Sequence, residues 1–382
     1  MLRLNHLDER HQPLHPDDAQ YLGRDAAARV QALLDLCPVA QRTPLRALPA
    51  LAEHLGLGAL FVKDESTRLG LGSFKALGGA YAVVTLVLEE ASRRLHRTVP
   101  PAELLEPAVR AIAADLTVAC ATDGNHGRSV AAGARFTGCR AVVFVHEGVA
   151  AERADAIAAC GAEIRRVPGV YADAVAAAAR EAGARGWILV ADTASPGYER
   201  IPQLVAQGYT VMVREALDAL PRPPTHAFVQ AGVGGLASAV AGYLSDALGD
   251  ARPRIVIVEP ERSACLLASH DAGKPVAVAQ DEATIMAMLE CQEPSLTAWR
   301  VLARLADAFM TVSEEDAVNA VRALAKPRGA DPAIAAGESG AAGLAGLLAA
   351  CASEAARRAL QLGDDSVVLL FNTEGATTGK SP

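Results

Sequence analysis

Apolar runs alternate with alanine-rich segments along most of the chain, and this alternation restricts the fold more than any other feature. The apolar runs are rich in β-branched residues and have no polar face, which is typical of parallel strands covered on both sides. The segments between them repeat their apolar residues with helical spacing. We therefore predict a doubly wound α/β fold. The predicted strands are 58–65, 116–122, 141–148, 162–168, 186–193, 226–232, 254–261 and 366–375.

Length and charge limit the class of protein. The 382 residues exceed what one simple core needs, so we expect two domains. The net charge of −8 argues against a nucleic-acid partner, because phosphate backbones are bound by basic surfaces. The first 23 residues lack the apolar core of a signal peptide, and the longest apolar run, 341–352, is too short to cross a bilayer. We expect a cytoplasmic protein that binds neither nucleic acid nor a membrane.

A lysine occupies an unusual place in the stretch "GLGSFKALGGAYAV" (70–83). Lys75 lies in the first turn of a predicted helix, where acidic residues are favoured over basic ones. A solvent-exposed lysine is one explanation. The other is a Schiff-base lysine, because partial burial and the helix N-terminus both lower the pKa of an amine and favour covalent catalysis.

The stretch "QAGVGG" (230–235) forms a second junction of strand, glycine loop and helix. Free backbone N–H groups at such a junction bind phosphate, although a tight turn explains the glycines as well. Gly232, Gly234 and Ala237 also fit a loose dinucleotide fingerprint, in which Glu259 would hold a ribose. A phosphate site is therefore predicted here, and a nicotinamide-dependent dehydrogenase stays open as an alternative from a different class.

Other polar side chains follow strands at the same predicted edge. In "ATDGNHG" (121–127), Asn125 can both donate and accept hydrogen bonds, whereas Asp123 would repel an anion and can equally cap a helix. Asp192, Thr373 and Glu338 lie in comparable places, where a turn or cap role and a ligand role are both open. No cluster with the spacing of metal ligands is present, so no metal site is predicted.

Three motifs together resemble one family. Ser73-Phe74-Lys75, Gly124-Asn125-His126 and Gly232-Val233-Gly234-Gly235 occur in the order and spacing of the fold-type II pyridoxal-phosphate enzymes, the tryptophan synthase β-like family. The resemblance implies two doubly wound α/β domains with the cofactor in the cleft between them. It further implies a large discontinuous domain (1–78 and 212–382), a smaller domain (79–211) and a homodimer.

The resemblance also implies roles for particular residues. Pyridoxal phosphate would be held by Lys75, Phe74, Asn125, Gly232, Val233, Gly234, Gly235 and Thr373. Lys75 would carry the cofactor covalently, the glycine run would hold its phosphate, and Thr373 would face its pyridine nitrogen. A small amino-acid substrate would be bound by Ser73, Thr122, Asp123, His126, Asp192 and Glu338.

Within the family, stretches such as "ATDGNHGR", "ATIMAMLECQEPSLTAW" and "NTEG" resemble the diaminopropionate ammonia-lyases. This resemblance implies α,β-elimination of L- and D-2,3-diaminopropionate to pyruvate and two ammonia, with Lys75, Asp123 and Asp192 catalytic. Lys75 would serve the L-isomer, Asp123 the D-isomer, and Asp192 would assist, because one base reaches only one face of a planar adduct. Both carboxylates also suit the substrate's second ammonium.

Two features leave the substrate open. Ser195 and Pro196 stand where the lyases usually have Trp-Glu, so a serine/threonine or hydroxyaspartate dehydratase of the same family remains the alternative. Cys265 and Cys291 lie in stretches shared with the lyases, which implies that they approach one another near the site entrance. Free thiols are the other possibility, favoured by a reducing cytoplasm.

Overall fold

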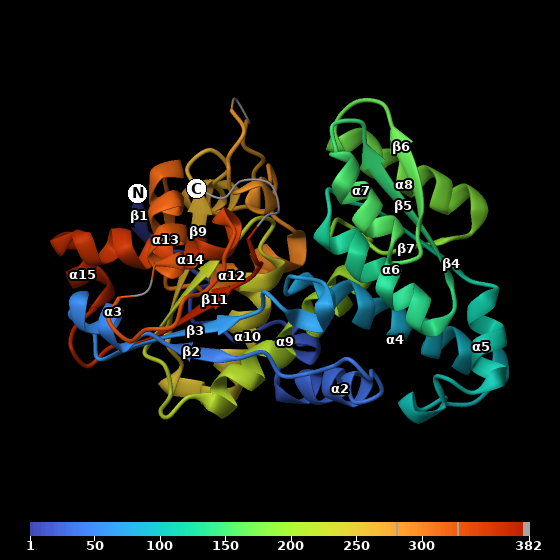
Figure 1. The fold of residues 1–382 in the computed structure, drawn as a ribbon, viewed down its shortest axis with the longest axis horizontal. Coiled ribbons are helices and arrows are strands. Elements are labelled where there is room, and N and C mark those ends of the chain that lie inside the picture. The colour runs from blue at the N-terminus through green and yellow to red at the C-terminus, as the bar shows by residue number, and fades with distance from the viewer. Residues whose placement is uncertain (280–281, 327, 377–382) are drawn as a thin grey trace.

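Two sheets organise the chain (Figure 1) in a computed structural model that describes residues 1–279, 282–326 and 328–376. The larger sheet has the strand order β1-β10-β9-β8-β11-β3-β2, and the smaller has the order β6-β5-β4-β7. The smaller sheet is wholly parallel, and so is the larger one apart from its edge strands β1 and β2. The strands are β1 (Leu2–Leu4), β2 (Leu45–Ala47), β3 (Ala59–Asp64), β4 (Thr117–Ala121), β5 (Arg140–His146), β6 (Glu163–Val167), β7 (Ile188–Leu189), β8 (His226–Gln230), β9 (Arg254–Pro260), β10 (Ala308–Val312) and β11 (Val367–Asn372).

Helices alternate with these strands, as the sequence pattern predicts. The α-helices are α1 (Pro16–Leu22), α2 (Arg24–Leu34), α3 (Pro49–His54), α4 (Lys75–Leu95), α5 (Pro107–Ala114), α6 (Asn125–Thr137), α7 (Ala151–Ala158), α8 (Tyr171–Arg185), α9 (Arg200–Ala219), α10 (Gly235–Leu248), α11 (Cys265–Ala272), α12 (Leu296–Leu305), α13 (Glu314–Ala325), α14 (Glu338–Ala352) and α15 (Glu354–Leu360). Short 3₁₀ turns are η1 (Arg68–Gly70), η2 (Pro101–Glu103), η3 (Gly249–Ala251) and η4 (Ala287–Leu289).

The larger sheet is covered on both faces, which explains why its strands read as continuous apolar runs. Side chains alternate between the two faces of a strand, and β8 shows this directly. Ala227 and Val229 belong to the core that includes α10, whereas Phe228 belongs to the core that includes α14. The predicted doubly wound α/β fold is therefore confirmed. The strands β1, β2 and β10 were not predicted, and β7 is much shorter than the predicted run 186–193.

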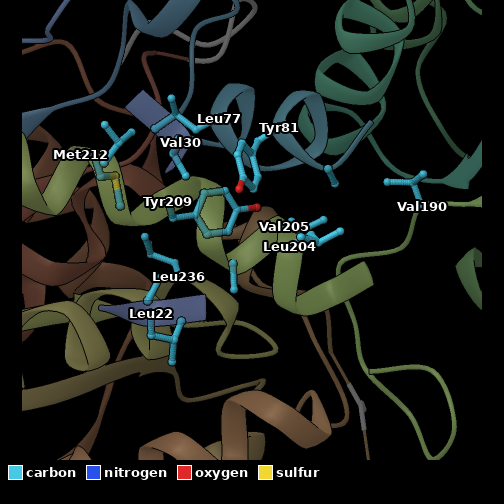
Figure 2. Packing of buried hydrophobic residues seen from close by; sticks show 14 of the residues in the cluster. Leu22, Val30, Leu77, Tyr81, Val190, Leu204, Val205, Tyr209, Met212 and Leu236 are labelled. Carbon is cyan, nitrogen blue, oxygen red and sulfur yellow. The ribbon is translucent and has the colours of Figure 1, made fainter. Parts of the chain in front are cut away.

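Helices α4 and α9 pack together between the two sheets (Figure 1). Glycine permits this close contact, because a Cβ added at Gly208 of α9 would lie 2.7 Å from the Cα of Gly78 in α4. Figure 2 shows Leu77 of α4 with Tyr209 and Met212 of α9 among the side chains of this core. Lys75 is the first residue of α4 and therefore lies at the end of one of two tightly packed helices.

Buried charges fasten the segment that precedes Lys75. Arg68 donates to both oxygens of Glu65 and to both oxygens of Glu215 in α9, and Lys63 of β3 donates to Glu215 at 2.6 Å. All four side chains are at most 4% exposed. Removing one partner of such a network leaves a buried charge unpaired, at a cost of about 3–5 kcal/mol.

Among the residues that the structure describes, no single helix is long and apolar enough to cross a membrane. Helices α14 and α15 meet the length and composition criteria only as a pair, across a bend of 109°.

Candidate active site

Lys75, the first residue of α4, and Asp192, which follows β7, form an ion pair. Nζ of Lys75 donates to Oδ2 of Asp192 at 2.9 Å, and the two side chains are 23% and 18% exposed. Burial lowers the pKa of Lys75, but the Asp192 carboxylate more than offsets burial and holds that pKa above its usual range. The low pKa expected for Lys75 is contradicted by this geometry, because sequence reasoning did not include an acid in contact with the amine.

His126 lies near Asp192 but is not hydrogen bonded to it. His126 is buried, its Nε2 donates to the carbonyl oxygen of Val190 at 2.8 Å, and its Nδ1 lies 3.9 Å from Oδ2 of Asp192. Burial raises the pKa of Asp192, yet Lys75 and His126 together bring that pKa well below its usual range. Asp192 is therefore a carboxylate that contacts two basic side chains.

The loop between β4 and α6 is held by Thr122 and not by Asp123. Oγ1 of Thr122 accepts from the backbone N–H groups of Gly124 at 3.0 Å and Gly127 at 3.2 Å. The possible helix-capping role of Asp123 is therefore wrong, because the neighbouring hydroxyl fills it. The Asp123 side chain is 38% exposed, and burial raises its pKa above the usual range.

Asn125 joins the two sheets through Glu374, a residue that sequence reasoning missed. Nδ2 of Asn125 donates to Oε2 of Glu374 at 3.0 Å, and burial raises the pKa of Glu374 to about 7. The same segment supports the Lys75 loop, since the N–H of Phe74 donates to the carbonyl oxygen of Thr373 at 3.0 Å and Ser73 forms a β-bridge with Glu374. Only its place at a strand end in "NTEG" signalled Glu374.

The glycine loop 232–235 lies close to Asp192. Gly234 has φ +95° and precedes α10, whose N-terminus has no side-chain cap, so the first N–H groups of α10 are available to an anion. A Cβ added at Gly235 would lie 4.0 Å from the carbonyl oxygen of Asp192, which brings the predicted phosphate loop beside the ion pair.

Glu259 has a role that excludes it as a ribose ligand. Its fully buried carboxylate accepts from the N–H groups of Leu266 at 2.7 Å and Leu267 at 2.8 Å, in the first turn of α11. Burial raises its pKa to about 8. Because the Glu259 carboxylate is enclosed and hydrogen bonded to α11, it is not available to bind a ribose. The dinucleotide-binding interpretation of Gly232–Ala237 therefore lacks the acidic residue that it requires.

Two cysteines flank the glycine loop. The thiol of Cys265 lies 3.7 Å from the carbonyl oxygen of Gly232, and a Cβ added at Gly232 would lie 2.8 Å from Sγ of Cys291. Both are free thiols, as are the other five cysteines.

Glu338 begins α14, and the N–H of the preceding Gly337 donates to the carbonyl oxygen of Glu374 at 3.3 Å.

The structure thus brings together side chains from both sheets that lie far apart in the sequence. Lys75 is hydrogen bonded to Asp192, and His126 lies 3.9 Å from the same carboxylate. Asn125 and Phe74 are linked through the segment 372–375, which contains Thr373. No group of three or more possible metal ligands occurs within residues 1–279, 282–326 and 328–376. The arrangement brings an amine, the uncapped N-terminus of α10 and carboxylates into one region of the fold.

Comparison with known proteins places this geometry in context. The family model described as pyridoxal-phosphate dependent enzyme matches residues 36–374. Diaminopropionate ammonia-lyase of Escherichia coli (strain K12) is 41% identical over 345 residues, which is 88% of this chain and 85% of that protein. A crystal structure of that E. coli enzyme in complex with D-serine matches with a TM-score of 0.88 and 36% identity, covering 98% of this chain and 93% of that chain. The biosynthetic L-threonine dehydratase of Pasteurella multocida (strain Pm70) is 27% identical over 266 residues, 69% of this chain and 43% of that protein.

Proposed function

The chain belongs to the family of pyridoxal-phosphate dependent enzymes, and on that premise we propose that it is an ammonia-lyase that converts 2,3-diaminopropionate to pyruvate and two ammonia. The observation that carries this proposal is the presence of two carboxylates, Asp123 and Asp192, near the single amine of Lys75. Both carboxylates interact electrostatically with Lys75. A substrate with a second ammonium gains from carboxylates that a threonine substrate would not need.

The residues present fit pyridoxal phosphate. The uncapped N-terminus of α10, after the glycine loop, suits a phosphate, and Lys75 is the amine that would bind the cofactor aldehyde. Nε2 of Gln230 donates to Oγ1 of Thr373 at 3.0 Å, which leaves the Thr373 O–H free to donate to an unprotonated ring nitrogen. When bound, the cofactor withdraws electrons from the α-carbon of the substrate.

We assign a separate proton-transfer role to each of three side chains. Lys75, once its amine is neutral, is the base on one face of the substrate, and we assign it the L-isomer. Asp123 lies on the loop before α6 and is the base for the D-isomer. Asp192 holds the Lys75 amine and moves a proton to or from its Nζ, because the two groups are already hydrogen bonded at 2.9 Å.

Ser195 and Pro196 stand where the lyases usually have Trp-Glu. Both residues are exposed and lie in a turn closed by the N–H of Ser195 donating to the carbonyl oxygen of Tyr198 at 3.2 Å. The Tyr198 hydroxyl in turn donates to the carbonyl oxygen of Leu189 at 2.7 Å, which ties the turn to β7. This turn begins three residues after Asp192 in the chain.

Comparing substrates tests the proposal. The purified holoenzyme should release pyruvate from both D- and L-diaminopropionate at least about tenfold more efficiently, in kcat/KM, than from serine, threonine or hydroxyaspartate, since a buried ion pair with a substrate exceeds ~1.4 kcal/mol. Higher efficiency with serine, threonine or hydroxyaspartate would establish the dehydratase alternative. Lys75→Ala should abolish turnover of every substrate and serves as the control for cofactor-dependent chemistry.

We further propose a cytoplasmic homodimer with a large domain (1–78 and 212–382) and a smaller domain (79–211). The seven free thiols favour a reducing compartment. The four strands of the smaller sheet all lie within 79–211, which supports that boundary. Light scattering of the holoenzyme measures the oligomeric state directly.

A further inference from the structure

Ser295 lies between two parts of the candidate active site. Its hydroxyl oxygen Oγ accepts from the backbone N–H of Ala194 at 2.9 Å, and its own N–H donates to the carbonyl oxygen of Val233 at 2.9 Å. The N–H of Leu296 also donates to the carbonyl oxygen of Ala194, at 3.1 Å. Ala194 belongs to the segment after β7 of the smaller sheet, and Val233 to the glycine loop after β8 of the larger sheet. Ser295 therefore joins the segment that carries Asp192 to the glycine loop.

The Ser295 hydroxyl does not serve its own helix. Ser295 is the N-cap residue of α12, a position where a serine side chain usually accepts from an N–H group of the first turn. Here the side chain makes no such bond, and the hydroxyl accepts instead from Ala194, 101 positions away in the chain. Ser353 shows the usual arrangement, since its hydroxyl accepts from the N–H of Ala356 within α15 at 3.2 Å. The contact of Ser295 is thus a long-range one in place of a local cap.

The segment that carries Asp192 is fastened on both sides of it. Before Asp192, the N–H of Val190 donates to the carbonyl oxygen of Ala119 in β4 at 2.7 Å. After Asp192, Ala194 is bound by Ser295, and these two residues are only 4% and 2% exposed. A buried N–H group that loses its acceptor destabilises the conformation that buries it. Removing the Ser295 hydroxyl should therefore displace the end of the segment that follows Asp192.

We propose that Ser295 is a positioning residue for Asp192, because it fixes the segment 192–194 so that the Asp192 carboxylate stays hydrogen bonded to Lys75. Oδ2 of Asp192 lies 2.9 Å from Nζ of Lys75, whereas Nδ1 of His126 is 3.9 Å away and forms no hydrogen bond. The place of the carboxylate therefore depends on the backbone that carries it. The inference rests on the proposed function only where it gives Asp192 a part in proton transfer.

Cofactor attachment to the apoprotein is the first test. Ser295→Ala removes the hydroxyl, and Ser353→Ala is the matched control, because it removes an N-cap hydroxyl that serves only its own helix. A displaced Asp192 stabilises the Lys75 ammonium less, so Ser295→Ala should attach pyridoxal phosphate ~3- to 10-fold faster at neutral pH, where tenfold corresponds to one pKa unit of the amine. Ser353→Ala should attach it at the unmodified rate. A slower or unchanged rate in Ser295→Ala would overturn the inference.

A double-mutant cycle separates an effect through Asp192 from a general loss of structure. If Ser295 acts through the carboxylate, Ser295→Ala should accelerate attachment in the otherwise unmodified protein but not in Asp192→Asn, where the charge is already gone. Equal fold-changes in the two backgrounds would show that Ser295 does not act through Asp192.

Hydrogen exchange tests the contact itself, without cofactor or substrate. Mass spectrometry of the peptide 190–198 should show faster exchange in Ser295→Ala than in Ser353→Ala or the unmodified protein, since the Ala194 N–H has lost its acceptor. Ser295→Gly removes the same hydroxyl at a helix cap where glycine is well tolerated, so it carries every measurement if Ser295→Ala does not fold. Unchanged exchange in the variant used would refute the contact.

Pyruvate release distinguishes failure of this inference from failure of the proposed function. In an active lyase, Ser295→Ala should lower kcat for both isomers of diaminopropionate by about tenfold, less than the loss expected when the proton-transfer group itself is removed. Faster attachment and faster exchange without any pyruvate release would support Ser295 as a positioning residue and refute only the proposed function. An active lyase in which Ser295→Ala leaves kcat and attachment unchanged would refute the role of Ser295.

Discussion

Replacing Asp192 by asparagine should make Lys75 easier to load with cofactor while impairing turnover. The substitution keeps the size of the side chain and leaves an oxygen near Nζ, but it removes the charge that lies 2.9 Å from the amine. Lys75 can attack the cofactor aldehyde only as the neutral amine, and Asp192 favours the charged ammonium. Asp192 should therefore slow the covalent attachment of the cofactor to Lys75.

The size of the effect follows from the exposure of the pair. At 23% and 18% exposed, both side chains are largely shielded from water, so the contact lies within the range of ~1.5–3 kcal/mol for a hydrogen bond between charged groups. One pKa unit corresponds to about 1.4 kcal/mol, so the pKa of Lys75 should fall by roughly one to two units. Near neutral pH, where Lys75 is mostly protonated, the neutral fraction should then rise by about 10- to 100-fold.

Stopped-flow mixing of the apoprotein with pyridoxal phosphate measures this directly, through the visible absorbance of the covalently attached cofactor. Asp192→Asn should bind faster across neutral pH, and kcat for both diaminopropionate isomers should fall by about 10²–10⁴-fold, as expected for loss of a group that moves protons. Asp115→Asn, at an exposed surface ion pair with Arg94, is the matched control and should match the unmodified protein. A capture rate that is unchanged or slower in Asp192→Asn would refute the electrostatic coupling of the pair.

Three other perturbations have defined outcomes. Gly208→Ala should lower the free energy of unfolding in urea by about 1–3 kcal/mol, because the added Cβ would overlap Gly78. The control Gly183→Ala should raise it by up to about 1 kcal/mol, since that Cβ meets no atom. Equal effects of the two substitutions would contradict the packing of α4 on α9. Glu374 has a raised folded pKa of about 7, so its contribution to stability is lost as pH rises from its ordinary value through 7. The unfolding free energy of the apoprotein should therefore fall by up to ~3 kcal/mol less over this pH range in Glu374→Gln than in the unmodified protein. If the unfolding free energies of the two proteins depend on pH in the same way, Glu374 does not have the raised pKa. Asp123→Asn should abolish pyruvate release from the D-isomer and spare the L-isomer, and equal loss of both would show that the two bases are not divided by enantiomer.

The sequence predicted the fold and the family because both depend on local patterns. Apolar runs mark the buried parallel strands, and the Lys75 stretch and the glycine loop 232–235 are short local motifs within the part of the chain that the family model matches. The short edge strands β1 and β2 were missed, since three residues cannot show periodicity. β10, "AFMTV", is fully buried but too short and too close to α12 to stand out.

The candidate site was less predictable, because its contacts join residues far apart in the chain. Lys75 and Asp192 are separated by 117 positions and Asn125 and Glu374 by 249, so no local signal could reveal that an acid would raise the pKa of the amine. A helix-capping role for Asp123 was expected from its place before α6. The hydroxyl of the preceding residue, Thr122, accepts these backbone N–H groups instead.

The 372–375 segment, at the end of β11, has a consequence for the order in which this protein can become functional. β11 is inserted between β8 and β3, and its last residues hold the Lys75 loop and reach Asn125. During synthesis, Lys75 leaves the ribosome almost three hundred residues before these contacts exist. The growing chain therefore lacks an assembled site until residue 374 has been added, and cofactor attachment in the native geometry must follow translation of β11.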